Sequence, residues 1–231
     1  MNRREYLGTV AGIGAIAAAG CIGGNSGYET TKVAGESVPL APTDDAYDWY
    51  QNDDLAVVDS RSSRVTWERT RIEGAVWSPA PRGRETSDPA AEYSEDRRIL
   101  TYCACPHHLS TQRAATLIKN GYEEVYALDK GIKHWIEQGH PIAGKNVAQD
   151  LPTYEIRGET SPDAAGEEVW VRAPDSGQRE PSTIAADGSY EVTFHFVEID
   201  DSTPLTVETP TYEVRAPLRT LTSTVVTPAM A

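Results

Sequence analysis

Two patterns of apolar and polar residues divide the chain. Between residues 44 and 146, short apolar runs alternate with stretches of helical periodicity, which indicates a parallel sheet with crossover helices. The sequence predicts strands over Leu55–Val58, Ala75–Trp77, Ile99–Tyr102 and Val125–Leu128. It predicts helices over Asp44–Gln51, Ser63–Arg69, Ser110–Asn120 and Ile132–Gln138. We therefore expect an α/β domain over residues 44–146.

From about residue 151 onward, apolar residues recur at every second position instead. In the clearest strand, one face carries Tyr190, Val192, Phe194 and Phe196, and the other carries Glu191, Thr193 and His195. Asp187-Gly188, just before it, is typical of a hairpin turn. Further strands are expected over Thr153–Arg157, Glu168–Arg172, Leu205–Thr209 and Thr211–Arg215. With prolines at fairly regular spacing between them, these strands predict a small all-β, sandwich-like domain over residues 150–231.

The N-terminal residues 1–21 are interpreted as an export signal rather than as part of the fold. Residues 2–7 resemble a twin-arginine signal, and the apolar run Gly8–Gly20 is too short to cross a ~30 Å hydrocarbon core at ~1.5 Å per residue. Residues 18–21 resemble a lipobox, in which Cys21 would carry the lipid. We expect an exported protein anchored by Cys21 to the outer face of the cytoplasmic membrane. Residues 22–43, rich in Gly, Ser, Thr and Pro, would form a flexible tether.

The charge of the chain bears on its partners, and its cysteine content bears on disulfide bonds. The chain has 35 acidic residues against 21 lysines and arginines, for a net charge of −14. A charge this negative repels nucleic acid, so no nucleic-acid partner is expected. Apart from Cys21, only Cys103 and Cys105 remain, which is no disulfide framework, although oxidising conditions outside the cell could join these two.

The strongest chemical signal is the stretch that contains these two cysteines. They follow the predicted strand Ile99–Tyr102, and a polar loop then leads to Ser110 or Thr111 as the cap of the next helix. Backbone N–H groups and the helix dipole favour an anion at such a place, which lowers the pKa of a thiol. The sequence therefore predicts a reactive cysteine.

Residues 55–143 resemble a rhodanese (sulfurtransferase) domain. The resemblance consists of five segments in the family's order: Leu55–Arg61, which ends in Asp-x-Arg, Arg71–Ala75, Tyr102-Cys103, Gly121–Leu128 and Gly131–Trp135. It implies that a loop cysteine takes a sulfane sulfur from a small donor, holds it as a persulfide and passes it to a thiol or another thiophilic acceptor. This reaction needs no cofactor and no metal. It also implies a substrate-binding loop made of Pro106, His107, His108, Leu109, Ser110 and Thr111.

Two alignments of that loop compete. Counting back from Thr111 by the family's spacing makes Cys105 the nucleophile, whereas counting from Tyr102 makes it Cys103 and lengthens the loop by two residues. We favour Cys103 as the nucleophile, with Cys105 as its resolving neighbour. The loop departs from the family in lacking glycine, and Pro106 removes one N–H donor.

Other interpretations of the same residues remain open. Cys103, Cys105, His107 and His108 could bind zinc or copper, although four ligands within six residues would crowd a tetrahedral site. The rhodanese fold could also be an inert scaffold, as is common in the family, with the β-domain recognising a protein partner. A phosphatase is disfavoured, because no arginine follows either cysteine at the required spacing.

Three residues outside the loop have structural interpretations. Asp59 and Arg61, which match the family's Asp-x-Arg, are expected to form a buried structural pair that supports the site. Trp135 is expected in the core.

Overall fold

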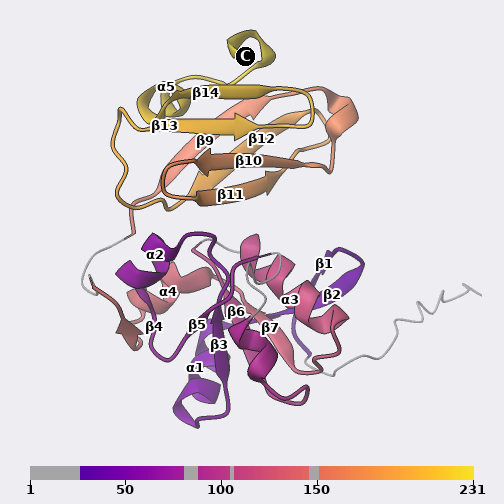
Figure 1. Ribbon diagram of the computed structural model, residues 1–231. Helices are drawn as coiled ribbons and strands as arrows, with labels where there is room; N and C mark the ends of the chain where they lie inside the picture. Colours follow the sequence, from indigo (N-terminus) through magenta and orange to yellow (C-terminus); the bar gives the residue numbers. More distant parts are fainter. Residues whose placement is uncertain (1–26, 81–87, 105–106, 146–150) are drawn as a thin grey trace, which may run out of the picture.

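The computed structural model describes residues 27–80, 88–104, 107–145 and 151–231. An α/β part comes first along the chain, and a C-terminal β-region, residues 151–231, lies beside it (Figure 1). No helix in the described residues is both long and apolar enough to cross a membrane.

A six-stranded sheet organises the α/β part, in the order β1-β2-β7-β6-β3-β5. β1 and β2 pair in antiparallel orientation, and each later pair of adjacent strands in this order is parallel. The strands are β1 (Thr30–Val33), β2 (Glu36–Ala41), β3 (Ala56–Asp59), β5 (Val76–Trp77), β6 (Ile99–Tyr102) and β7 (Val125–Leu128). A separate small antiparallel pair consists of β4 (Arg71–Ile72) and β8 (Ile142–Ala143).

Helices cover both faces of this sheet. They are α1 (Thr43–Gln51), α2 (Arg64–Arg69), α3 (Leu109–Lys119) and α4 (Gly131–Glu137), with the 3₁₀ turn η1 (Pro89–Glu92). Ala46 of α1 and Trp135 of α4 pack on one face, and Ala114 and Leu117 of α3 pack on the other. Because both faces are covered, β3, β6 and β7 are buried along their whole length, as is usual for parallel strands.

Each predicted helix and strand of the α/β part is confirmed, with both ends within one residue of the prediction. The strands Ile99–Tyr102 and Val125–Leu128 have the predicted bounds. Trp135 is fully buried, as expected.

The flexible tether predicted for residues 22–43 is wrong where the structure describes it. Residues 30–41 form the hairpin β1–β2, whose turn contains Ala34 and Gly35, both at positive φ. Val38 and Leu40 point into the core, and β2 pairs in parallel with β7. The polar composition of residues 22–43 did not indicate the strand β2, although alternate residues of this strand are buried.

The C-terminal β-region contains two antiparallel sheets. One has the order β11-β10-β13-β14 and the other pairs β12 with β9. Its elements are β9 (Tyr154–Glu159), η2 (Pro162–Ala164), β10 (Glu168–Ala173), β11 (Gln178–Thr183), β12 (Ser189–Phe194), β13 (Pro204–Glu208), β14 (Glu213–Pro217), α5 (Leu218–Ser223) and η3 (Pro228–Met230).

One strand of this region, β11, was not predicted. Its sequence has no apolar alternation, and Pro181 argues against a strand. In the structure Pro181 lies opposite Trp170 on an edge strand, where proline is tolerated. This strand is the one drawn nearest to the α/β part (Figure 1).

Candidate functional site

Cys103 lies directly after β6, at the carboxyl edge of the sheet. Its side chain is fully buried, and its thiol donates a hydrogen bond to Ser110 Oγ at 3.4 Å. The backbone N–H groups of His108 and Ser110 also reach the sulfur. The predicted cradle at a strand end and a helix start is therefore present around Cys103.

Burial nevertheless outweighs this cradle. Loss of solvent and, to a smaller extent, the nearby carboxylate of Glu180 raise the pKa of the Cys103 thiol from 9.0 to about 12, against the lowering effect of the hydrogen bonds. The predicted lowering of this pKa is therefore wrong for the arrangement in the structure. The thiol is neutral at physiological pH while the sulfur remains covered.

The start of α3 differs from the prediction. The helix begins at Leu109 with His108 at the N-cap position, so Ser110 and Thr111 lie in its first turn. The Thr111 hydroxyl donates to the carbonyl oxygens of His107 and His108. Neither hydroxyl caps the helix: the Ser110 hydroxyl accepts from the Cys103 thiol, and the Thr111 hydroxyl bonds to the two histidines that precede the helix.

The two histidines of the loop contact different carboxylates. His107 Nε2 lies 2.7 Å from Asp129 Oδ1, and His108 Nδ1 lies 3.2 Å from Glu180 Oε1. Within the described residues, no group of three or more histidine, cysteine or acidic side chains could hold a metal. Cys105 and Pro106 lie outside the described residues, and so does any Cys103–Cys105 bond.

The interpretation of Asp59 and Arg61 as a buried pair agrees with the structure. Arg61 Nε donates to Asp59 Oδ1 at 2.9 Å, and both side chains are almost completely buried. Arg61 Nη2 also donates to the Thr70 carbonyl oxygen at 2.6 Å. Burial alone would lower the pKa of Arg61, but the charge of Asp59 more than reverses this and keeps the guanidinium ionised.

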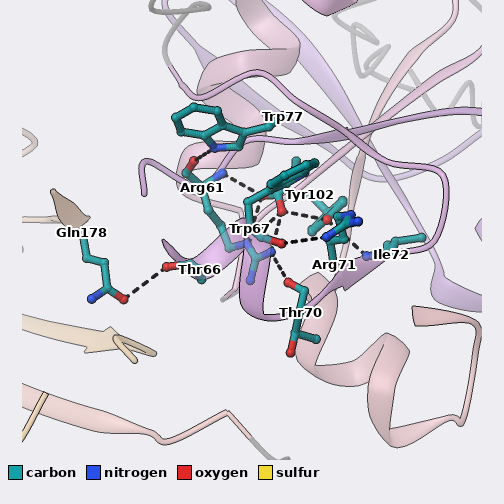
Figure 2. A network of polar contacts seen from close by, with 10 residues as sticks. Arg61, Thr66, Trp67, Thr70, Arg71, Ile72, Trp77, Tyr102 and Gln178 are labelled. Atoms are coloured by element: carbon teal, nitrogen blue, oxygen red, sulfur yellow. Dashed lines mark hydrogen bonds and ion pairs between the residues drawn. The ribbon is translucent and has the colours of Figure 1, made fainter. Parts of the chain in front are cut away.

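This pair is joined to the strand that carries the cysteine. The Tyr102 hydroxyl donates to Asp59 Oδ2 at 2.8 Å and accepts from the backbone N–H of Ile72 at 3.2 Å. Figure 2 shows Arg61 and Tyr102 within this network, with the Trp77 indole bonded to the Arg61 carbonyl. Because Tyr102 directly precedes Cys103, the network fixes the end of β6.

Residues of β11, which sequence analysis missed, contact the same edge of the α/β part. The Arg179 backbone N–H donates to Ser62 Oγ at 3.0 Å, and its guanidinium donates to the Ala80 carbonyl oxygen at 2.8 Å. The Thr66 hydroxyl donates to Gln178 Oε1 at 3.2 Å (Figure 2). These partners are more than 95 residues apart in sequence, so no local pattern could have indicated them.

A pocket lies where the two parts meet, and Ala104, the residue after Cys103, is among its lining residues. It is lined on one side by Arg61, Thr66 and Leu109 and on the other by Glu180, His195 and Phe196. Arg61 Nη1 is buried and has no hydrogen-bond partner among the described residues. His195, which directly follows β12, lines this pocket and is only 6% exposed, although it alternates with apolar residues in the sequence.

The geometry supports one kind of chemistry at this edge. A sulfur nucleophile lies within reach of N–H donors that would stabilise negative charge, and a rigid buried ion pair holds its strand. The sulfur is at present neutral and covered, so reaction requires both deprotonation and access.

Comparisons with known proteins agree with the α/β architecture. A family model described as a rhodanese-like domain matches residues 42–138. Among solved structures, a protein from Bacillus halodurans shares 21% identity, with 48% of this chain and 85% of that chain covered and a TM-score of 0.41. A rhodanese-related protein from Thermoplasma volcanium shares 21% identity, with 46% and 98% covered and a TM-score of 0.39. The rhodanese-like domain of a protein from Anabaena sp. shares 22% identity, with 49% and 85% covered and a TM-score of 0.40.

No curated protein matches the chain. The matched segment begins just before α1 and ends just after α4, and it contains Asp59, Arg61 and Cys103. Residues 42–138 therefore form a rhodanese-like domain, with the fold of the sulfurtransferase family, and a region of antiparallel β-sheets follows it.

Proposed function

We propose that the protein is a sulfurtransferase or persulfide carrier in which Cys103 moves a sulfane sulfur from a small donor to a thiol or another thiophilic acceptor. One observation carries the proposal. The sulfur of Cys103 lies at the end of β6 and meets the backbone N–H groups of His108 and Ser110. Those donors would stabilise the negative charge of a thiolate or a persulfide.

The reaction consists of two displacements at sulfur. The Cys103 thiolate attacks the sulfane sulfur of the donor, the S–S bond of the donor breaks, and its electron pair leaves with the remainder of the donor. An acceptor thiolate then attacks the outer sulfur of the persulfide, and Cys103 leaves as a thiolate. The two steps need no external oxidant or reductant, and the proton of the resting thiol goes to solvent.

Intact-mass analysis tests the proposal. The reduced protein is incubated with thiosulfate, and one added sulfur atom is expected, mapped by peptide analysis to Cys103. Cys103→Ser should abolish loading, whereas Cys105→Ser should keep it. Loading that disappears only in Cys105→Ser would move the nucleophile to Cys105, and absence of loading in every variant and the parent would remove the proposed activity.

A second candidate function also has an observation in its favour. The complete burial of Cys103 and its raised pKa suit an inert rhodanese fold that serves as a scaffold, with the C-terminal β-region binding a protein partner. The same mass experiment separates the two, because an inert scaffold takes up no sulfur. A metal retained in the native mass spectrum would instead favour the Cys/His metal site.

We further propose that the protein acts outside the cytoplasm, anchored through a lipid on Cys21. The support is the sequence of residues 1–21, which lie outside the described residues. Cys21→Ala should release the protein from the membrane, and lysines in place of Arg3 and Arg4 should leave the precursor inside the cell. A Cys21→Ala protein that stays membrane-bound as firmly as the parent would exclude the lipid anchor.

A further inference from the structure

Cys103 is covered by the C-terminal β-region. Its sulfur belongs to a small apolar cluster with Ala80 and Leu109, and Trp170 of β10 packs against that cluster. None of the Cys103 surface is exposed. The residues that separate this sulfur from solvent therefore include a side chain from beyond the rhodanese-like domain.

Hydrogen bonds hold the covering strands in one position. Ser63 Oγ donates to the Ser176 carbonyl oxygen at 2.8 Å, in addition to the contacts of Ser62 with Arg179. Gln178 is almost fully buried; its Oε1 accepts from Thr66 Oγ1 and from a backbone N–H of its own region, and its Nε2 donates within that region. A buried amide with this many partners fixes β11 against the α/β part.

Glu180 links the covering strand to the cysteine loop. Its carboxylate is 4% exposed and contacts the His108 ring at 3.2 Å. The backbone N–H of His108 reaches the sulfur of Cys103. Glu180 therefore holds the residue that supplies one of the donors around the sulfur.

We propose that β10 and β11 form a cap over the cysteine site, that Glu180 is the positioning residue of this cap, and that the cap must open before Cys103 reacts. The sulfur-exchange part of this inference rests on the proposed function. The opening step does not, because it governs any reagent that attacks the thiol.

The charges around Cys103 also affect the ionisation of its thiol. The groups that face or flank the sulfur from the packed elements are Glu180 and Arg179 of β11, His108 before α3, Arg61 after β3 and His195 after β12. Asp59 pairs with Arg61, and Arg179 bonds to Ala80, which leaves the buried Glu180 charge opposing a thiolate. The closed cap thus keeps the thiol protonated and shielded.

This arrangement predicts an unusual dependence of thiol reactivity on pH. If only the rare open state reacts, ionisation of its thiol draws the protein out of the closed state, so the fraction of reactive thiolate continues to increase well above the pKa of an ordinary thiol. The alkylation rate of Cys103 should therefore rise without levelling off between about pH 8 and about pH 10, where an ordinary thiol levels off.

The first experiment loosens the cap and measures alkylation of Cys103 by iodoacetamide, with peptide mapping to separate it from the other cysteines. Ser63→Ala removes only the contact with Ser176, because Ser63 makes no capping bond to α2. Loss of one hydrogen bond should speed alkylation about fivefold, and Gln178→Ala should speed it more. The matched control is Ser202→Ala, which removes a bond to Asp200 within the β-region and should leave the rate unchanged.

The second experiment compares the pH profile of alkylation in Glu180→Gln with that of the parent. Neutralising the buried carboxylate should lower the pH at which the rate levels off, and by more than Ser63→Ala, which loosens the cap but keeps the charge. Glu191→Gln is the control, because this carboxylate is exposed and pairs with Arg157 on the surface. Its profile should match that of the parent.

The outcomes separate the cap from the proposed activity. Faster alkylation in the loosened variants without sulfur loading keeps the cap and removes the sulfurtransferase function. If the parent takes up sulfur but its Cys103 is alkylated as fast as an unprotected thiol, the proposed function is kept and the cap is overturned. An unchanged pH profile in Glu180→Gln would remove the role assigned to that residue.

Discussion

The state of Cys103 depends on residues from several parts of the chain. The N–H groups at the start of α3 favour a thiolate, while burial by Leu109 and Trp170 and the charge of Glu180 oppose it. The opposing contributions are larger, because a buried thiolate loses its hydration. Local sequence therefore supplies the nucleophile, and distant residues determine whether it is ionised.

The raised pKa of Cys103 makes stability depend on alkaline pH. A thiol whose pKa is about 12 when folded and near 9 when unfolded contributes its full stabilisation below about pH 9 and loses it as the pH approaches 12. The free energy of unfolding of the parent should fall by up to ~1.4 kcal/mol per pH unit over this interval from this group. Urea titrations at several pH values should show a shallower fall in the free energy of unfolding for Cys103→Ser than for the parent. Some fall remains in this variant, because its tyrosines also titrate over this interval.

The Asp59–Arg61 pair offers a second prediction at the scale of single residues. Asp59→Asn leaves the buried Arg61 guanidinium without its counter-charge, which should destabilise the protein by about 3–5 kcal/mol. Glu191→Gln disrupts an exposed pair with Arg157 and should cost less than about 1 kcal/mol. Similar losses in both variants, measured by urea unfolding, would contradict a structural role for the buried pair.

Individual elements differ in how much their own sequence determines. The strands β6 and β7 were predictable because each is a short apolar run buried on both faces. By contrast, β2 and β11 have polar or proline-containing sequences, and pairing with β7 or β10 stabilises them. The cysteine loop was predictable as a site, but its cover was not, because the contacts that form it join residues far apart in sequence.

The pairing of β9 with β12 supports a prediction at the scale of elements. Gly158 lies opposite Tyr190, and a Cβ at position 158 would collide with the tyrosine ring. Gly158→Ala should therefore destabilise the protein by about 1–3 kcal/mol, because the buried Tyr190 ring must move. Thermal unfolding should show the loss, and part of it should disappear when Tyr190→Leu makes room for the added methyl group.

At the scale of the whole molecule, the two parts share more than a covalent link. Val197 and Leu151 of the C-terminal β-region belong to the same apolar cluster as Ile132 and Trp135 of α4. The division near residues 146–150 remains a prediction, and fragments on either side would each expose apolar surface that the intact chain covers. We expect a fragment of residues 27–146 to expose Cys103, because its cover lies in the missing region.

The hairpin β1–β2 provides a sharper test of where the α/β part begins. A fragment that starts at residue 44 loses β2, so β7 becomes an edge strand and the buried side chains of Val38 and Leu40 are absent. Burial of each such side chain contributes about 1.5–3 kcal/mol, and Tyr28 additionally packs edge-on against Tyr126. Residues 44–146 should therefore unfold at lower urea concentration than residues 27–146, or fail to fold. Equal stability of the two fragments would mean that the hairpin contributes nothing to the fold and that the α/β part begins at α1.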